Sequence, residues 1–149
     1  MIEGVFIEEL KQLGDDRGKV MHMLRADSPL FSGFGEVYFS MVNPGIVKAW
    51  KKHLKMTQNF AVPVGKIKLV IYDDRLDSGS FSKVEELDIG EDNYLLVRIP
   101  PLVWYGFKGI SDSSALIANC TDIPHDPEES LRLDSYSDKV PYDWKKGGR

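Results

Sequence analysis

The chain has 149 residues, 42% of them hydrophobic, so we expect one domain over residues 1–149 with a sizeable core. A formal net charge of −4 provides no broad basic surface and argues against a nucleic-acid partner. The single cysteine, Cys120, cannot form an internal disulfide, which suits a reducing compartment. The sequence shows no leader-like start and no apolar run long enough to cross a bilayer. These features favour a cytoplasmic protein without a membrane partner.

Short segments of alternating or β-branched residues, separated by turns, follow one another along the chain. Strands are predicted at residues 5–10, 19–24, 36–42, 46–50, 58–64, 66–72, 84–89, 94–99, 103–107 and 115–120. The segment 36–42 is rich in aromatic and β-branched residues and is interpreted as a central strand. Pro127 after Asp126 predicts a short helix in a turn-rich C-terminal tail. The pattern indicates an all-β sandwich or barrel.

The stretch from Gly45 to Gly65 has the spacing of the first cupin motif, G-x5-H-x-H-x3-4-E-x6-G. Its three ligand positions hold Lys51, His53 and Gln58. An ammonium repels a metal ion, an amide is a weak ligand, and one imidazole cannot hold a metal alone. We therefore predict no metal, which argues against a metal-dependent oxygenase. His53 is then either a proton-transfer group or a structural histidine.

Several stretches together resemble the dTDP-4-dehydrorhamnose 3,5-epimerase family, whose members are metal-free cupins. They are Asp16-Arg17-Gly18, the PGIVKAWKKH segment ending at His53, Gln58, residues 68–81, residues 99–107, Arg132-Leu133-Asp134 and residues 141–144. Their order and spacing match over nearly the whole chain. The resemblance implies a cupin or jelly-roll β-barrel, no cofactor, a nucleotide-sugar substrate and a homodimer.

The family's reaction removes a proton beside the C4 ketone of a 4-keto-6-deoxy sugar and returns it to the other face. Such chemistry needs a base with a pKa near neutrality, an orienting carboxylate, an acid, and a donor for the enolate oxygen. The resemblance assigns the base to His53 and the carboxylate to Asp134, although Asp138 lies close in sequence. It assigns Arg17 to the nucleotide diphosphate. Arg75 is either a similar contact or part of a turn.

Two groups of the family's site are missing at their usual positions. The enolate-stabilising lysine falls on Phe60, and the acid tyrosine falls on Ala118. Side chains elsewhere on the barrel wall, namely Tyr105, Tyr38, Lys51 or Lys68, are possible substitutes. The predicted catalytic residues are His53, Asp134 and Tyr105, and the predicted substrate-binding residues are Arg17, Tyr38, Trp50, Lys51, Gln58 and Lys68.

The missing groups leave alternatives to a two-centre epimerase. The chain could invert one centre, isomerise the keto group, or bind a nucleotide sugar or another small anion without turnover. Trp50, Phe60 and Trp104 are interpreted first as core residues, and as surfaces for a nucleobase or sugar ring if they line the cavity. His22 and His125 are interpreted as surface residues.

Overall fold

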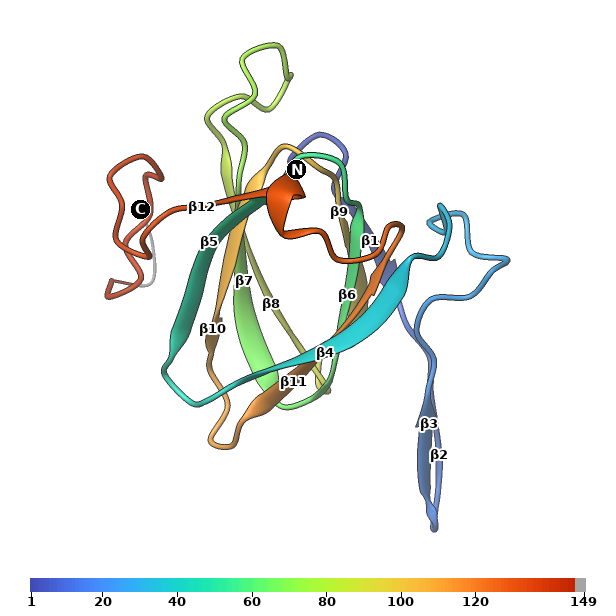
Figure 1. Ribbon diagram of the computed structural model, residues 1–149. Helices are drawn as coiled ribbons and strands as arrows, with labels where there is room; N and C mark the ends of the chain where they lie inside the picture. Colours follow the sequence, from blue (N-terminus) through green and yellow to red (C-terminus); the bar gives the residue numbers. More distant parts are fainter. Residues whose placement is uncertain (147–149) are drawn as a thin grey trace.

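The computed structural model describes residues 1–146 and consists almost wholly of β-strands (Figure 1). The strands are β1 (Phe6–Glu9), β2 (Gln12–Asp15), β3 (Gly18–Met21), β4 (Glu36–Val42), β5 (Val47–His53), β6 (Gln58–Val64), β7 (Lys66–Tyr72), β8 (Val84–Gly90), β9 (Leu95–Ile99), β10 (Trp104–Gly109), β11 (Ala115–Thr121) and β12 (Ser130–Arg132). A 3-10 turn, η1 (Pro127–Glu129), precedes β12. Asp126 caps this turn by accepting a hydrogen bond from the backbone N–H of Glu128. The short helix predicted after Asp126 is therefore confirmed.

The strands form two five-stranded sheets and a separate hairpin of β2 and β3. The first sheet has the order β1-β9-β6-β11-β4 and the second has the order β12-β5-β10-β7-β8. Neighbouring strands of both sheets pair antiparallel, and most neighbours come from distant parts of the sequence. This arrangement is that of a jelly roll closed around a core. The predicted all-β, cupin-like fold is confirmed.

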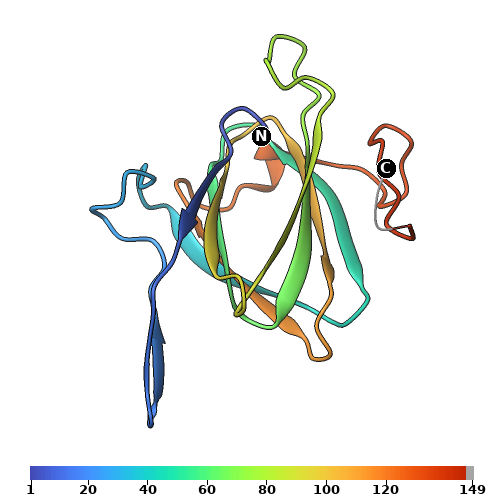
Figure 2. The ribbon, with the colours of Figure 1, turned by 180° about the vertical axis from the view of Figure 1, so that it is seen from behind.

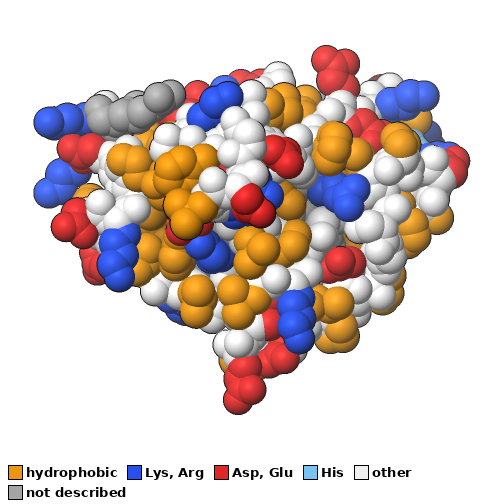
Figure 3. Space-filling view, turned by 90° about the horizontal axis from the view of Figure 1, so that it is seen from above, with side chains coloured by type: hydrophobic (Ala, Val, Ile, Leu, Met, Phe, Trp, Pro, Cys, Tyr) orange, Lys and Arg blue, Asp and Glu red, His pale blue; other side chains and the backbone are white. Residues whose placement is uncertain are grey.

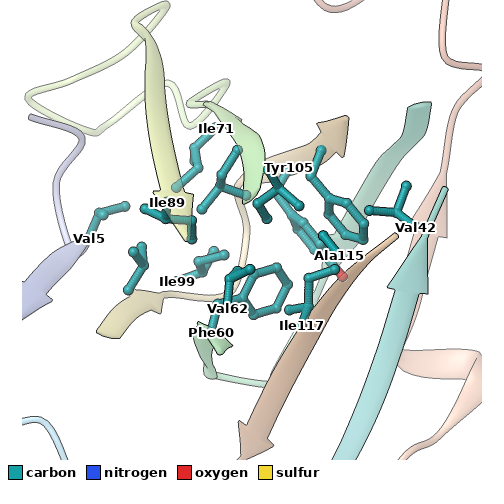
Figure 4. Close-up of a cluster of buried hydrophobic side chains, with 14 of the residues drawn as sticks. Val5, Val42, Phe60, Val62, Ile71, Ile89, Ile99, Tyr105, Ala115 and Ile117 are labelled. Atoms are coloured by element: carbon teal, nitrogen blue, oxygen red, sulfur yellow. The ribbon is translucent and has the colours of Figure 1, made fainter. Parts of the chain in front are cut away.

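The core fills the space between the two sheets. On β7, Ile67, Leu69 and Ile71 are fully buried and share the inward face, because alternate side chains of a strand point to the same side. They meet Phe60 and Val62 of β6 across the barrel. Figure 4 shows Ile71, Phe60 and Val62 among the apolar side chains that converge from both sheets. The same alternation turns the intervening β7 side chains outward.

A second apolar cluster attaches the C-terminal segment to the outside of the second sheet. Trp50 of β5 is 2% exposed and packs edge-on against Tyr142 and at a tilt against Trp144. Its indole N–H donates to the backbone oxygen of Ser135 at 3.1 Å. Figures 1 and 2 show this segment lying beside β5, outside the barrel. The cluster fixes the path of the chain that follows β12.

Strand β4 lies at an edge of the first sheet, so the prediction of a central strand is wrong. Its outward residues Val37, Phe39 and Met41 are all exposed. Aromatic and β-branched content reports a pleated, half-buried surface and does not report the position of a strand within a sheet. The inward residues Tyr38 and Ser40 line a cavity.

The outer surface carries charges of both signs. In Figure 3, acidic and basic side chains are interspersed with apolar ones over the visible face. The β2–β3 hairpin projects away from the barrel in both ribbon views (Figures 1 and 2). Among residues 1–146, no helix has the length and apolar character needed to span a membrane.

Candidate active site

A cavity of about 530 Å³ opens between the two sheets. Its walls are formed by Tyr38, Ser40, Lys48, Ala49, Trp50, Lys51, Gln58, Phe60, Tyr105, Phe107, Ile117, Asn119, Arg132 and Leu133. Among residues 1–146, this lining contains three cationic side chains and no carboxylate. A cavity of this size and polarity suits a small anionic ligand.

His53 ends strand β5 and lies directly behind the cavity wall formed by Tyr105. Its side chain is 3% exposed, and its Nδ1 is hydrogen-bonded to Oε1 of Glu129, which is 5% exposed. The other carboxylate oxygen, Oε2, accepts hydrogen bonds from the backbone N–H groups of Lys55 at 3.1 Å and Met56 at 3.2 Å. The imidazole N–H and the two backbone N–H groups together fix the position of the Glu129 carboxylate.

The local chain path explains how Glu129 reaches His53. Asp126 and Pro127 set the single turn of η1, and Glu129 is its last residue. Strand β12 then pairs with β5 so that Ser130 lies opposite His53. The residue before Ser130 is consequently brought next to the imidazole ring.

The electrostatics of the pair favour a neutral imidazole and an ionised carboxylate. Burial lowers the pKa of His53, and the hydrogen bond to Glu129 opposes this shift only in part. Burial acts to raise the pKa of Glu129, but the hydrogen bonds from His53, Lys55 and Met56 outweigh it, and the pKa is lowered. An ionised carboxylate only accepts hydrogen bonds, so His53 carries its proton on Nδ1. Its Nε2 atom keeps a free lone pair.

Tyr105 of β10 stands between that lone pair and the cavity. Its hydroxyl lies 3.4 Å from Nε2 of His53, and the two rings are stacked with centroids 6.0 Å apart. Burial raises the pKa of Tyr105 well above its usual value, so the phenol stays protonated and donates to Nε2. At 3.4 Å this contact is long for a hydrogen bond.

Cationic side chains stand beside Tyr105 on the inner face of the second sheet. Lys51 of β5 is the cross-strand partner of both Tyr105 and Arg132. Burial and the nearby Arg132 guanidinium lower the pKa of Lys51. This arrangement gathers two positive charges near the His53–Tyr105 pair, where an anionic oxygen would be stabilised.

The prediction that Asp134 orients His53 is wrong, because Glu129 occupies that place. Asp134 is exposed, and its carboxylate accepts a hydrogen bond from the backbone N–H of Tyr136 at 2.9 Å. The backbone of Leu133 pairs with Trp50 rather than with His53, which carries Asp134 past the ring. Asp138, the alternative, is exposed as well.

Of the predicted substrate-binding residues, Tyr38, Lys51 and Gln58 lie on the cavity wall. Trp50 borders the cavity too, but its indole is packed in the outer cluster with Tyr142 and Trp144. The structure therefore supports the interpretation of Trp50 as a core residue.

Two predicted binding residues lie away from the cavity of their own chain. Lys68 is on the outward face of β7 and pairs with Asp88 at 2.8 Å, so its prediction as a cavity residue is wrong. Arg17 is at the turn of the projecting hairpin, where it pairs with Asp15 and is 86% exposed. Arg17 therefore does not contact a ligand bound inside the barrel that its own chain forms.

Within residues 1–146, no group of three or more His, Cys, Asp or Glu side chains is arranged to hold a metal ion. At the three motif positions, the Lys51 ammonium and the Gln58 amide line the cavity, and only His53 offers an imidazole. His53, with Glu129, Tyr105 and the nearby cations, forms an arrangement suited to proton transfer.

Comparisons with known proteins find a matching family and related proteins. The family model for dTDP-4-dehydrorhamnose 3,5-epimerase matches residues 1–147. The probable low-salt glycan biosynthesis epimerase Agl13 of Haloferax volcanii is 36% identical over 144 residues, which cover 95% of this chain and 89% of that protein. The spore coat polysaccharide biosynthesis protein SpsL of Bacillus subtilis is 30% identical over 146 residues, which cover 97% of this chain and 97% of that protein.

A crystal structure of a dTDP sugar isomerase from Desulfovibrio desulfuricans G20 is similar in both sequence and fold. It is 52% identical and superimposes with a TM-score of 0.94 over 97% of this chain and 92% of that one. The barrel and its two sheets therefore have a close counterpart of known structure.

Proposed function

The chain belongs to the dTDP-4-dehydrorhamnose 3,5-epimerase family, and we propose that it epimerises a dTDP-linked 4-keto-6-deoxy sugar beside the ketone. The observation that carries this proposal is the buried His53–Glu129 pair directly behind Tyr105 of the cavity wall. A neutral imidazole held in one tautomer by a carboxylate is the arrangement that a general base requires.

In the proposed reaction, Nε2 of His53 removes the proton from C3 or C5 of the sugar. The electron pair of the broken C–H bond moves to the C4 carbonyl oxygen, and the resulting enolate is stabilised by nearby donors. Tyr105 turns its hydroxyl from Nε2 to this oxygen, and Lys51 supplies a positive charge. Glu129 stabilises the imidazolium that forms.

The substrate's charge fits the polarity of the cavity. Lys48, Lys51 and Arg132 line it without a neighbouring carboxylate in the wall, so a diphosphate has cationic partners there. The relatives' names point to dTDP sugars and glycan epimerisation. Gln58, fully buried in the wall, contributes a hydrogen-bonding group for the sugar.

Exchange in deuterated water tests the proposal, with dTDP-4-keto-6-deoxyglucose as substrate and NMR as the readout. The wild-type protein should incorporate deuterium at C3 or C5, and His53→Gln should abolish incorporation while keeping its thermal transition. Incorporation by His53→Gln at the wild-type rate would contradict the assignment of the base.

A second candidate function is binding of a nucleotide sugar without turnover. Binding without turnover is favoured by two replacements: Phe60 stands in the place of the family's lysine, and Ala118 in the place of its acid tyrosine. Calorimetric binding of the same nucleotide sugar, with no deuterium at either carbon in the wild-type protein, would support this function over epimerisation.

We also propose that the chain forms a homodimer in which the hairpin of one copy reaches the cavity of the other. Leu13 and Val20 of the hairpin are 57% and 61% exposed, and Arg17 stands at its turn. Leu13→Ser with Val20→Ser should convert a dimer into a monomer in light scattering. Arg17→Ala should weaken nucleotide binding without changing the mass.

A further inference from the structure

The amide of Asn119 has a fixed orientation on the cavity wall. Its Oδ1 accepts a hydrogen bond from the backbone N–H of Asn59 at 3.3 Å. Its Nδ2 donates to Oε1 of Gln58 at 3.0 Å and to the hydroxyl oxygen of Tyr38 at 2.9 Å. A side-chain NH2 group has two hydrogens, and these two contacts use both. The Tyr38 oxygen is therefore an acceptor in its contact with Asn119.

The hydroxyl hydrogen of Tyr38 is consequently not used in that contact. Tyr38 is half-buried and lines the cavity, so its free O–H group can point into the cavity. Burial raises the pKa of Tyr38, although the hydrogen bond from Asn119 opposes the shift. The phenol is thus a proton donor at neutral pH.

Tyr38 and His53 belong to opposite sheets. Tyr38 is on β4 of the first sheet, and His53 is on β5 of the second. Gln58 lies between them, in contact with Asn119 on one side and with the Tyr105 hydroxyl on the other. A side-chain amide holds its hydrogens and does not pass a proton along. The two groups therefore carry protons independently.

We propose that Tyr38 is the general acid that returns the proton to the opposite face of the sugar. This inference rests on the proposed epimerase function. The O–H bond of Tyr38 breaks, a C–H bond forms with the enolate's electron pair, and the C4 carbonyl is restored. Tyr38 is left as a phenolate and His53 as an imidazolium, and both return to their resting forms by proton exchange with water.

The strand register supports this assignment independently of the proton count. The family's acid tyrosine falls on Ala118, whose neighbour Asn119 is the cross-strand partner of Tyr38. Tyr38 thus places a hydroxyl beside Asn119 on the same cavity wall. Asn119 acts as the positioning residue for it.

The test compares proton abstraction with inversion in one assay. Wild type, Tyr38→Phe and a control, Tyr94→Phe, are incubated with dTDP-4-keto-6-deoxyglucose in deuterated water. Tyr94 is buried at 7% exposure and is not among the cavity residues. NMR measures deuterium at C3 and C5, and reduction of the product reports the configuration at each carbon.

Tyr38→Phe should still incorporate deuterium, because His53 returns a solvent-derived deuteron to the original face. Its rate of inversion should fall by about 100-fold, the usual size of an acid–base contribution. Tyr94→Phe should behave as wild type in both readouts.

Inversion by Tyr38→Phe at a rate within about twofold of wild type would overturn the assignment and leave the proposed function intact. Equal loss of exchange and inversion in a folded Tyr38→Phe protein would also overturn it, because the residue would then act before proton return. A wild-type protein without exchange would remove the proposed function itself, and this inference with it.

Discussion

The Glu129→Gln substitution tests the His53–Glu129 pair most directly. The carboxylate accepts hydrogen bonds from Nδ1 of His53 and from the backbone N–H groups of Lys55 and Met56. A glutamine keeps one oxygen and presents an NH2 group to the remaining donors. With hydrogen bonds to charged groups worth about 1.5–3 kcal/mol each, we expect a loss of roughly 2–4 kcal/mol in the free energy of unfolding at pH 7.

The effect on activity should exceed the effect on folding. Glu129 is the group that opposes the burial-induced fall in the pKa of His53. Without it, the pKa of His53 drops further, and the imidazole becomes a weaker base with no fixed tautomer. We expect the exchange rate to fall by about 100-fold or more. The acid limb of the pH–rate profile should move to lower pH.

The pH dependence of stability gives a second readout. The folded pKa of Glu129 is lowered, so its contribution is present above the unfolded value near 4.5 and is lost as pH falls toward the folded value. The folded pKa of His53 is also lowered, so stability decreases as pH falls below 6.5. Glu129→Gln should lose stability more steeply below pH 6.5 and more shallowly below pH 4.5 than wild type.

Matched controls make the result decisive. Glu128→Gln changes the adjacent exposed carboxylate, and Asp134→Asn changes the residue that the sequence assigned to this role. Both should retain the wild-type exchange rate and melting temperature. Activity lost in Asp134→Asn but kept in Glu129→Gln would refute the reasoning, since it would return the orienting role to Asp134.

Three further predictions concern other parts of the fold. Tyr105→Phe should lower kcat by about 100-fold with little change in KM, in steady-state kinetics, because it removes a donor proposed for the enolate. Asp73→Asn should lose about 3–5 kcal/mol in urea unfolding at pH 7, because the fully buried carboxylate accepts from Arg75, Ser78 and Ser80. Burial opposes ionisation of Asp73, but these hydrogen bonds outweigh it and hold the pKa of the carboxyl far below its usual range. The wild-type protein should therefore lose this contribution to stability only in strong acid. The exposed control, Asp77→Asn, should unfold as the wild type does. Trp144→Ala should cost about 3–5 kcal/mol in the same assay and change the near-ultraviolet circular dichroism, because Trp144 is 1% exposed between Trp50 and Tyr142.

The strands of the barrel were predictable because their pattern is local. The predicted segments 36–42, 58–64 and 66–72 have the same bounds as β4, β6 and β7. Strand β12, with three residues, and strand β2, with four, have too little alternation to be detected. Their partners are set by tertiary contacts, which a linear pattern does not contain.

Strand alternation predicts the outward orientation of Lys68 correctly, whereas its assignment as a substrate-binding residue does not. Within the predicted strand 66–72, alternation places Ile67, Leu69 and Ile71 on one face and Lys68 on the other. Because the three apolar residues face the core, Lys68 has to face outward, where it meets Asp88. The residue type suggested a substrate contact, but the strand's own geometry excluded it.

Glu129 was hidden for a different reason. The turn beginning at Asp126 was visible in the sequence, but the target of its last residue depends on the register of β12 against β5. A shift of that pairing by one residue would turn every β12 side chain to the other face. The base could therefore be assigned from a local motif, while its carboxylate required the fold. The same holds for Tyr38, whose place beside Asn119 follows from the pairing of β4 with β11. In this barrel the groups proposed for proton transfer come from different strands, so sequence motifs identify the base and the cross-strand register identifies its partners.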